Sequence, residues 1–249
     1  MDQLKITIIT VCYNSDKTIE RTIKSILQQS YDNIEYIIID GGSTDDTLNI
    51  LKKHNDTINF VLSEPDEGLY YAMNKGIKFA TGDVIGILNS DDFFKDNFVL
   101  QKIVNQFEIT KSHMVYGNID YVNNENKIVR YWKSSVFKKK SFSKGWHPPH
   151  PSLFIKKKIY DKYGIFNTNL RICSDFELML RFFEVNNISS SYLDLTTTTM
   201  LVGGASNTLA GIIRGRKEIN VAFKLHNIKR SIFYDYYRYM PKILKLINK

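Results

Sequence analysis

The first hundred residues alternate between apolar runs rich in β-branched side chains and segments with the apolar spacing of helices. This alternation predicts an α/β fold with a mostly parallel, twisted sheet and helices on both faces. The predicted strands cover residues 5–12, 35–40, 58–62 and 83–89. The predicted helices cover residues 19–27, 44–53 and 69–80, with Asn14 or Ser15 capping the first and a Ser43–Asp46 capping box opening the second.

Polar residues follow three of these strands directly. They occupy positions 10–14, 40–43 and 89–92. In sheets of this type, ligands bind beyond the carboxyl ends of the strands. We therefore expect the three polar clusters to meet at one edge of the sheet and to line one crevice.

The second half of the chain is less regular. Residues 114–121 and 127–132 predict a hairpin, and the basic, polar residues 133–145 predict a mobile loop. Three prolines exclude a helix over residues 146–151. The remaining predicted elements are a short strand at 152–155, a helix capped by Ser174, an extended segment at 192–200 and a helical, basic region after 203–204 that is broken at Pro241.

An acidic pair, Asp91-Asp92, follows the predicted strand 83–89. Two carboxylates repel each other at a strand end unless a cation or a donor offsets their charge. Mn²⁺ or Mg²⁺, held by one or two carboxylates together with substrate phosphates, supplies that cation in many sites. The alternative is a plain turn in which an aspartate caps the helix that begins near Asn97.

The turn Asp40-Gly-Gly-Ser43 has two interpretations. Its glycines would let the backbone approach a ligand, with Asp40 accepting a hydrogen bond from a base or a ribose. Alternatively it is an ordinary strand-to-helix turn. The Gly-x-Gly-x-x-Gly spacing of dinucleotide-binding folds is missing.

Further along the chain, Asp175 and Glu177 lie near the start of an amphipathic helix. There a carboxylate serves either as a partner of the helix dipole or as a general base at the edge of a cleft. His147 and His150 lie in the proline-stiffened segment, where they either contact a diphosphate or a metal or remain solvent-exposed. Neither a zinc-type Cys/His cluster nor a nucleophile-elbow serine is present.

Together these motifs resemble the family 2 glycosyltransferases, in order and spacing, over roughly residues 4–200. The closest similarity is to bacterial enzymes that build surface polysaccharides such as O-antigen or capsule. The motifs are Thr10-Val-Cys-Tyr-Asn14, Ile39-Asp-Gly-Gly-Ser-Thr-Asp45, Asp66-Glu-Gly-Leu-Tyr-Tyr-Ala-Met-Asn-Lys-Gly76, Thr81-Gly-Asp83, Leu88-Asn-Ser-Asp-Asp92, Trp146-His-Pro-Pro-His150 and Ser174-Asp-Phe-Glu-Leu178.

The resemblance implies a nucleotide-sugar-binding α/β fold, Mn²⁺ or Mg²⁺ as cofactor, and an inverting single displacement. It makes Asp91 the metal ligand and Asp175 the catalytic base. It places nucleotide-sugar contacts at Thr10, Tyr13, Asp40, Gly42, Asp66, Lys75, Asn89, Ser90 and Asp91. It places acceptor or diphosphate contacts at Trp146, His147 and His150, to which the basic loop Lys138–Lys140 would add positive charge.

The chain departs from the family pattern in three places. Asn89 replaces the first aspartate of the Asp-x-Asp motif, which leaves fewer anionic metal ligands. Gly41 replaces a second aspartate, so Asp40 alone is left to contact the base. Ser174 replaces a glutamate that would raise the pKa of the neighbouring base by repulsion.

Basic charge is concentrated at the C-terminus. Residues 214–249 hold ten Lys/Arg and two acids, a net +8, so the other 213 residues hold 24 of each sign and are neutral. Aromatic and apolar residues lie between these cations, a mixture that suits an anionic membrane surface. The alternatives are a nucleic-acid contact and a terminal helix packed on the core with a solvated basic face.

Composition limits the cellular setting. Charged residues make up 24% and hydrophobic residues 43% of the chain, which excludes wholesale disorder. Apolar runs stay shorter than a membrane span needs, and no signal peptide is visible at the N-terminus. Cys12 and Cys173 lie far apart in apolar settings, as expected of buried thiols in a reducing compartment. These features predict a cytoplasmic protein, peripheral on the inner face of the membrane.

The sequence thus predicts a catalytic domain at 1–205, with a nucleotide-sugar half at 1–112 and an acceptor half at 113–205, and a basic helical appendage at 206–249. The predicted activity is inverting transfer of a hexose from a UDP-sugar to a lipid-linked saccharide, without a nucleic-acid partner. The alternative is a non-enzymatic module that binds a membrane or a nucleic acid, which would bind no nucleotide at the strand ends. A nucleotidyltransferase would need a glycine-rich phosphate loop near the N-terminus, and none is visible.

Overall fold

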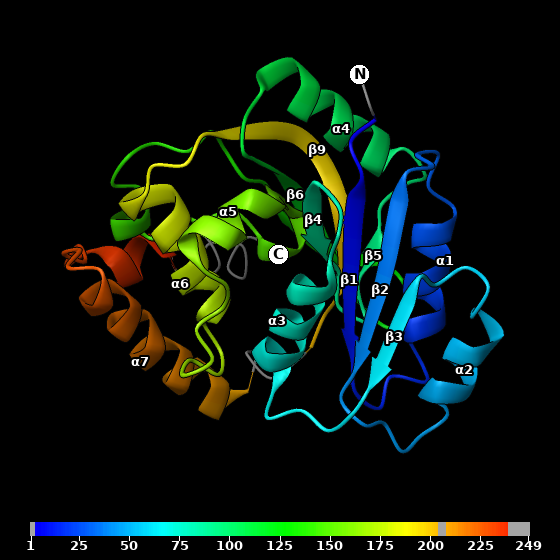
Figure 1. Ribbon diagram of the computed structural model, residues 1–249. Helices are drawn as coiled ribbons and strands as arrows, with labels where there is room; N and C mark the ends of the chain where they lie inside the picture. The colour runs from blue at the N-terminus through cyan, green and yellow to red at the C-terminus, as the bar shows by residue number, and fades with distance from the viewer. Residues whose placement is uncertain (1–2, 204–207, 239–249) are drawn as a thin grey trace.

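A nine-stranded sheet forms the centre of the computed structural model, which describes residues 3–203 and 208–238 (Figure 1). The order along the sheet is β3-β2-β1-β4-β8-β6-β9-β5, and β7 pairs with β6. The strands are β1 (Ile6–Cys12), β2 (Ile34–Asp40), β3 (Phe60–Ser63), β4 (Val84–Ile87), β5 (Phe93–Phe94), β6 (Met114–Val122), β7 (Ile128–Trp132), β8 (Leu153–Lys156) and β9 (Ser190–Leu201).

The predicted parallel arrangement is confirmed for β3, β2, β1 and β4. Beyond β4 the sheet is mixed. The strand β8 runs antiparallel to both β4 and β6, whereas β9 runs parallel to β6. The predicted hairpin is the antiparallel pair β6 and β7. One continuous sheet therefore joins the two predicted halves of the chain.

Helices cover both faces of the sheet, as predicted. The helices are α1 (Ile19–Leu27), α2 (Thr47–Lys53), α3 (Leu69–Phe79), α4 (Val99–Thr110), α5 (Lys157–Tyr163), α6 (Ser174–Leu180) and α7 (Leu209–Leu225). Residues of α1, α2 and α4 build one hydrophobic core with the sheet, and residues of α3, α5, α6 and α7 build the other. Figure 1 shows α1 and α2 on one side of the sheet and α3, α6 and α7 on the other.

The predicted helix caps were wrong for α1 and α2. Thr18 and Asp46 precede these helices, and neither uses its side chain as a cap. The predicted caps instead join the strand-end loops to one another. Ser43 Oγ accepts a hydrogen bond from the Asn14 backbone, and Thr47 Oγ1 accepts one from the Ser15 backbone.

The predicted mobile loop 133–145 is anchored to the core. Phe142 is fully buried in an aromatic cluster and begins a short 3-10 turn, Phe142–Lys144. Glu184 accepts backbone hydrogen bonds from Lys140 and Phe142. The expected absence of helix over 146–151 was also wrong at its end, because His150–Ser152 form a 3-10 turn. Pro151 fits its first turn, where the missing N–H costs nothing.

The C-terminal region packs on the core up to the last described residue. Ile219, Ala222 and Phe223 of α7 are buried, as is Tyr234 beyond it. Up to residue 238, the C-terminal region therefore resembles the alternative in which a terminal helix packs on the core. The predicted break at Pro241 lies outside the described residues.

A buried carboxylate holds the amino-terminal side of the sheet together. Glu35 on β2 accepts hydrogen bonds from Thr7, from Lys5 and from both the backbone and the hydroxyl of Thr81. Burial alone would raise the pKa of Glu35, but these hydrogen bonds outweigh it and lower the pKa from 4.5 to about 2. A carboxyl group whose pKa is depressed on folding stabilises the protein above its unfolded pKa.

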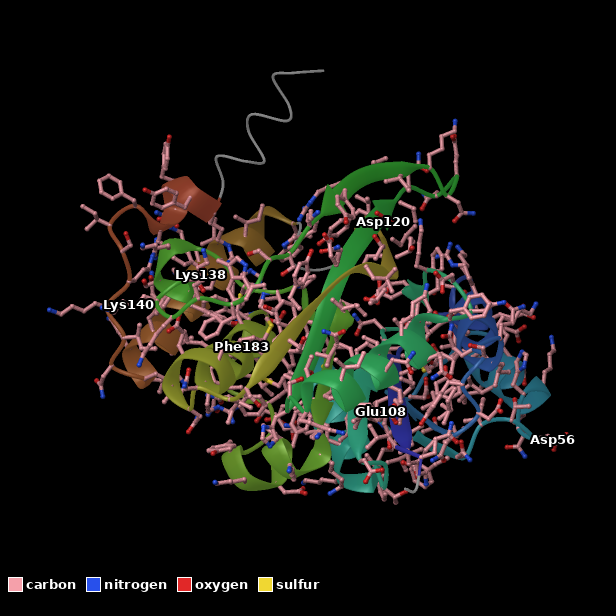
Figure 2. The ribbon with its side chains drawn as sticks, turned by 90° about the horizontal axis from the view of Figure 1, so that it is seen from above. Asp56, Glu108, Asp120, Lys138, Lys140 and Phe183 are labelled. Carbon is pink, nitrogen blue, oxygen red and sulfur yellow. The ribbon has the colours of Figure 1, made fainter. Side chains whose placement is uncertain are left out.

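We therefore expect Glu35→Gln to lower the free energy of unfolding at pH 7 by about 1–3 kcal/mol. Wild type should lose this advantage as the pH falls from 4.5 towards 2, so the two proteins should converge in acid. Urea unfolding at pH 7 and pH 3 measures the difference. Glu108→Gln, on the exposed side of α4 (Figure 2), is the control and should change the free energy of unfolding little at either pH. A deficit of the same size at both pH values would contradict this account.

Candidate functional site

The polar clusters after β1, β2 and β4 meet, as the sequence predicted. The Asn14 backbone donates to Ser43 Oγ at 2.8 Å, and Ser15 Oγ lies 2.8 Å from Ser90 Oγ. Three loops that are distant in the sequence therefore form one connected edge. Parallel strands place their carboxyl ends side by side, which is why these loops come together.

Two of the predicted nucleotide contacts lie beneath this edge. Asp40 is fully buried, and its carboxylate accepts hydrogen bonds from the backbones of Gly42 and Ser43 and from the Ser63 hydroxyl. Burial would raise the pKa of Asp40, but these donors lower it overall. Thr10 is also fully buried, with its hydroxyl 3.2 Å from the Tyr36 hydroxyl. Both side chains support the loops from within.

Tyr13 and Gly42 lie on the accessible side of the same edge. Tyr13 is 64% exposed, so its ring is free to stack on a planar ligand. Gly42 has a φ of +81°, and a Cβ there would lie 3.2 Å from the backbone nitrogen of Pro65. The turn therefore needs glycine at this position both for its conformation and for its close approach to the segment after β3.

Lys75 on α3 forms ion pairs with two carboxylates of the preceding loop. Its ammonium pairs with Asp66 and with Glu64. Burial opposes the charge of Lys75, but the hydrogen bonds to Asp66 and Glu64 outweigh it and raise its pKa. Asp66 and Lys75, both predicted to lie near the nucleoside, are thus in direct contact and fix the loop that leads into α3.

Two carboxyl groups after β4 lie where burial disfavours their ionised forms. Burial raises the pKa of Asp91, and it raises that of the fully buried Asp92 much further, with a contribution from Asp91 itself. Asn89 donates to one oxygen of Asp92 at 3.1 Å. Over residues 3–203 and 208–238, Asp92 Oδ1 and Asn89 Oδ1 are buried without a hydrogen-bond partner.

Arg21 of α1 is the nearby cation. One nitrogen of its guanidinium lies 3.3 Å from the Asp91 carbonyl oxygen and another 2.7 Å from Asn126, and the group stacks 4.2 Å above the Phe93 ring. Burial lowers the pKa of Arg21, although the charges of Asp91 and Asp92 oppose this effect. No sequence motif marks Arg21, because it lies within an ordinary amphipathic helix.

The donor set suits a hard divalent cation. Asp91 is partly exposed and offers a carboxylate, and Asn89 and Asp92 add the unpartnered oxygens described above. The described residues contain no cluster of three or more His, Cys, Asp or Glu that could hold a metal alone. Mg²⁺ and Mn²⁺ are commonly bound by one or two carboxylates with substrate phosphates as the remaining ligands. The residues present therefore fit the cofactor that the resemblance implies.

Asp175 lies in the first turn of α6 and contacts a tyrosine from the other half of the chain. The Tyr70 hydroxyl, on α3, lies 3.1 Å from Asp175 Oδ1 and 2.9 Å from the Ile172 carbonyl oxygen. Tyr70 is buried and its ring stacks on Phe166 at 5.4 Å. Asp175 itself is partly exposed, so its second oxygen is available to a ligand.

The three aromatic or histidine residues of the 146–150 segment have different surroundings. His150 is buried against Phe166, and burial lowers its pKa although Asp175 opposes this effect. His147 is partly exposed and packs edge-on against Trp132 and Phe176. Trp146 belongs to the aromatic cluster around Phe183. His147 and His150 thus lie near α6, whereas the contacts of Trp146 are those of a packing residue.

Tyr121 on β6 lies within electrostatic range of both acidic groups of the site. Burial raises the pKa of Tyr121, the nearby Arg130 lowers it, and the charges of Asp92 and Asp175 both raise it further. Its hydroxyl is therefore within electrostatic range of the carboxyl groups that follow β4 and of the one that begins α6. Arg130 stacks over the Tyr121 ring at 4.2 Å. Neither residue carried a motif signal, because both lie in an ordinary hairpin.

The predicted contribution of the basic loop is not supported by its position. Lys140 lies beside Glu184, nine residues beyond Asp175 along α6 and the π-helical turn Arg181–Val185 that follows it. Figure 2 shows Lys138 and Lys140 on the side of the molecule that carries the C-terminal segment.

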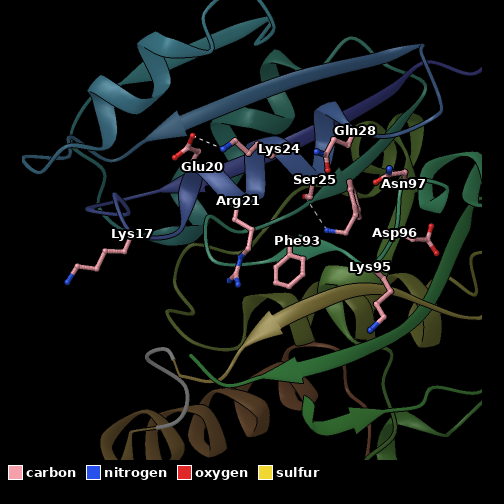
Figure 3. A pocket seen from close by; sticks show the side chains of 11 residues that line it. Lys17, Glu20, Arg21, Lys24, Ser25, Gln28, Phe93, Lys95, Asp96 and Asn97 are labelled. Atoms are coloured by element: carbon pink, nitrogen blue, oxygen red, sulfur yellow. Dashed lines mark hydrogen bonds and ion pairs between the residues drawn. The ribbon is translucent and has the colours of Figure 1, made fainter. Parts of the chain in front are cut away.

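A groove of about 570 Å³ runs between α1 and β5 (Figure 3). A second hollow of about 300 Å³ is lined by the same Arg21, Phe93 and Lys95 together with residues of the β6–β7 hairpin. Neither is lined by Asp91 or Asp175. Arg21, which lines both hollows, is also the residue that contacts the Asp91 carbonyl oxygen.

Comparison with known proteins identifies the family. The model of the family "Glycosyl transferase family 2" matches residues 7–181, more than half of the chain. An uncharacterized glycosyltransferase of Mycobacterium tuberculosis is 30% identical over 71% of this chain and 68% of its own length. The glucosyltransferase WfgD of Escherichia coli, named UDP-Glc:alpha-D-GlcNAc-diphosphoundecaprenol beta-1,3-glucosyltransferase, is 32% identical over 53% of this chain and 52% of its own length.

Solved structures share the fold at lower identity. Staphylococcus aureus TarS 1–349 in complex with UDP-GlcNAc matches with a TM-score of 0.70 and 19% identity, over 94% of this chain and 70% of that one. The mannosyltransferase PcManGT of Pyrobaculum calidifontis, in complex with GDP-Man and Mn²⁺, matches with a TM-score of 0.65 and 17% identity, over 96% and 70%. With the family model matching from β1 into the end of α6, the chain belongs to glycosyltransferase family 2.

Proposed function

We propose that this glycosyltransferase transfers a hexose from a UDP-sugar, with inversion, to a hydroxyl group of a lipid-linked saccharide in surface polysaccharide synthesis. The observation that carries the proposal is the 3.1 Å contact between Tyr70 and Asp175, because Tyr70 lies on α3, the helix whose Lys75 pairs with Asp66. The residues that would face the nucleoside and the carboxylate that would face the acceptor thus meet at one helix, although Asp66 and Asp175 are more than one hundred positions apart in the sequence.

The relatives support the choice of substrates. TarS is described in complex with UDP and with UDP-GlcNAc, and the name of WfgD specifies UDP-Glc as donor and a diphosphoundecaprenol-linked sugar as acceptor. WfgD and this chain share about half of their lengths, so the sugar transferred here is not specified by that likeness.

In the proposed reaction Asp175 acts as the general base. An acceptor hydroxyl is a poor nucleophile at neutral pH, and a carboxylate that takes its proton during attack speeds the transfer. The hydrogen bond from Tyr70 to Oδ1 orients the carboxylate and leaves Oδ2 for the incoming hydroxyl. Attack from the side opposite the nucleotide inverts the anomeric centre.

The donor side of the proposed site binds the nucleotide and its diphosphate. Tyr13 offers a ring for the base, and the Asp66–Lys75 pair shapes the loop beside it. Asp91, with the oxygens of Asn89 and Asp92, would hold the divalent cation. When bound, that cation offsets the negative charge that grows on the departing diphosphate.

We expect Asp91→Asn to weaken Mn²⁺-dependent binding of UDP at least ~10-fold, because the accessible carboxylate at the end of β4 is lost. Isothermal titration with and without Mn²⁺ measures the effect. Asp56→Asn is the control, since Asp56 lies exposed in the turn after α2 (Figure 2), and this variant should bind UDP as wild type does. Equal Mn²⁺-dependent affinity in Asp91→Asn and wild type would contradict the assigned metal ligand.

Asp175→Asn should lower kcat about 10²- to 10⁴-fold while UDP binding stays within about twofold, because an amide cannot accept the proton. The assay uses the UDP-sugar that wild type turns over fastest in a screen with Mn²⁺. Asp161→Asn, an exposed change on α5, serves as control. A normal rate in Asp175→Asn would exclude Asp175 as the base.

We also propose that the C-terminal segment contacts an anionic membrane. Four apolar side chains beyond α7 are at least half exposed: Ile232, Phe233, Tyr236 and Tyr237. Two exposed lysines, Lys224 and Lys229, precede them in the sequence. Aromatic rings beside cations suit the interface of an anionic bilayer, where a lipid-linked acceptor would be presented. Within the described residues, no helix is both long and apolar enough to cross a bilayer.

Sedimentation with phosphatidylglycerol vesicles tests this surface. Phe233→Ser with Tyr237→Ser should reduce the bound fraction several-fold, and binding should weaken with salt. Phe98→Ser is the matched control, because Phe98 is 57% exposed, as Phe233 is 56%, but precedes α4. Equal vesicle binding by wild type and the double variant would refute membrane contact through these residues.

A further inference from the structure

The helix that carries Asp175 begins without a side-chain cap of its own. Cys173 occupies the N-cap position and makes no capping hydrogen bond, and Ser174 Oγ is buried without a partner among the described residues. The first N–H groups of a helix and of the turn before it need acceptors when they are buried. The segment 171–173 therefore depends on groups from elsewhere in the chain.

Glu218 of α7 supplies those acceptors. Its Oε1 accepts a hydrogen bond from the Arg171 backbone at 3.1 Å, and its Oε2 accepts from Ile172 at 2.8 Å and from Cys173 at 2.9 Å. Glu218 is 8% exposed, so these three bonds are shielded from water. Hydrogen bonds to an ionised acceptor are stronger than those between neutral groups.

Tyr70 holds the same segment from the other half of the chain. Its hydroxyl lies within hydrogen-bond distance of the Ile172 carbonyl oxygen and of Asp175, as described above. The single hydroxyl proton of Tyr70 is shared between these two acceptors, so Tyr70 ties the Ile172 carbonyl to Asp175, while Glu218 holds the Ile172 N–H. The residue three positions before Asp175 is thus contacted at both of the peptide groups that flank its Cα.

The position of Glu218 is itself set by close packing between α7 and α6. A Cβ at Gly215 would lie 3.3 Å from Cys173 Sγ, so α7 approaches this segment closely. Phe223 packs edge-on against Phe176 at 5.6 Å, and His226 lies 2.7 Å from Glu177 Oε1. The carboxylate of Glu218 is therefore presented to residues 171–173 by a stretch of α7 that is packed on both sides of it, at Gly215 and at Phe223.

We infer that Glu218 is a positioning residue for the catalytic base, holding the start of α6 so that Asp175 meets the acceptor hydroxyl. The inference rests on the proposed role of Asp175 as the base. The family match ends at residue 181, so this contribution comes from a helix outside the matched region. A shift of about 1 Å in a catalytic group can cost about 100-fold in rate, and three hydrogen bonds before the helix oppose such a shift.

Glu218→Gln is the test, since the amide replaces one acceptor oxygen with donors that face backbone N–H groups. We expect kcat to fall about 10- to 100-fold and the KM of the UDP-sugar to stay within about twofold. Hydrogen–deuterium exchange of the full chain should become at least ~10-fold faster in peptides covering 171–173, with α3 unchanged. Glu218→Asp, which keeps the carboxylate, should recover part of the rate and of the protection.

Glu108→Gln is the matched control and should leave rate and exchange unchanged. Wild-type kcat in Glu218→Gln, or unchanged exchange at 171–173, overturns the inference, as does a parallel loss of UDP binding and kcat. If Glu218→Gln does not fold, kcat and hydrogen exchange at 171–173 are measured on Glu218→Asp instead. Wild-type values of either quantity in that variant then overturn the inference. Asp175→Asn is measured alongside: full activity there refutes the proposed base, whereas an inactive Asp175→Asn with a fully active Glu218→Gln refutes the positioning role alone.

Discussion

The buried carboxylate of Asp40 is the contact on which the donor edge of the sheet depends. It lies at the end of β2 with no exposed surface and accepts hydrogen bonds from its own turn and from Ser63 at the end of β3. Ser43, which also bonds to Asp40, accepts the Asn14 backbone and so brings in the loop after β1. Because a buried charge is tolerated only when donors surround it, the loops are held in one arrangement. Every accessible group at this edge, Tyr13 included, rests on that arrangement.

The carboxyl groups after β4 form the opposite case. Asp40 has a lowered pKa because its donors outweigh its burial, whereas Asp91 and Asp92 have raised pKa values because theirs do not. A protein that leaves a buried oxygen such as Asp92 Oδ1 without a donor sacrifices stability there. A divalent cation bound together with the donor substrate would offset that loss of stability. The difference between satisfied and unsatisfied carboxylates thus separates the groups that build the site from those that would act in it.

The sequence predicted the donor half far better than the acceptor half, for physical reasons. The strands β1, β2 and β4 are buried on both faces and show as β-branched runs, and their loops are local in the chain. The same burial hides which side a strand residue faces, so Thr10 and Asp40 were predicted as contacts although they lie inside. The order of β8, β6 and β9 comes from pairings between distant segments. Tyr70 resembles an ordinary core residue until the fold brings it to Asp175.

Donor binding and placement of the proposed base therefore depend on different sets of contacts. The donor edge is built within the first hundred residues, from turns that follow their own strands. The proposed base, Asp175, is held by Tyr70, 105 positions before it, and through the 171–173 segment by Glu218, 45 to 47 positions beyond the residues that Glu218 binds. Because these long-range contacts share no residue with the Asp40 network, the region around α6 and α7 can change while the nucleotide edge stays intact. That separation suits a fold in which one arrangement for binding a nucleotide sugar is combined with sites for many different acceptors.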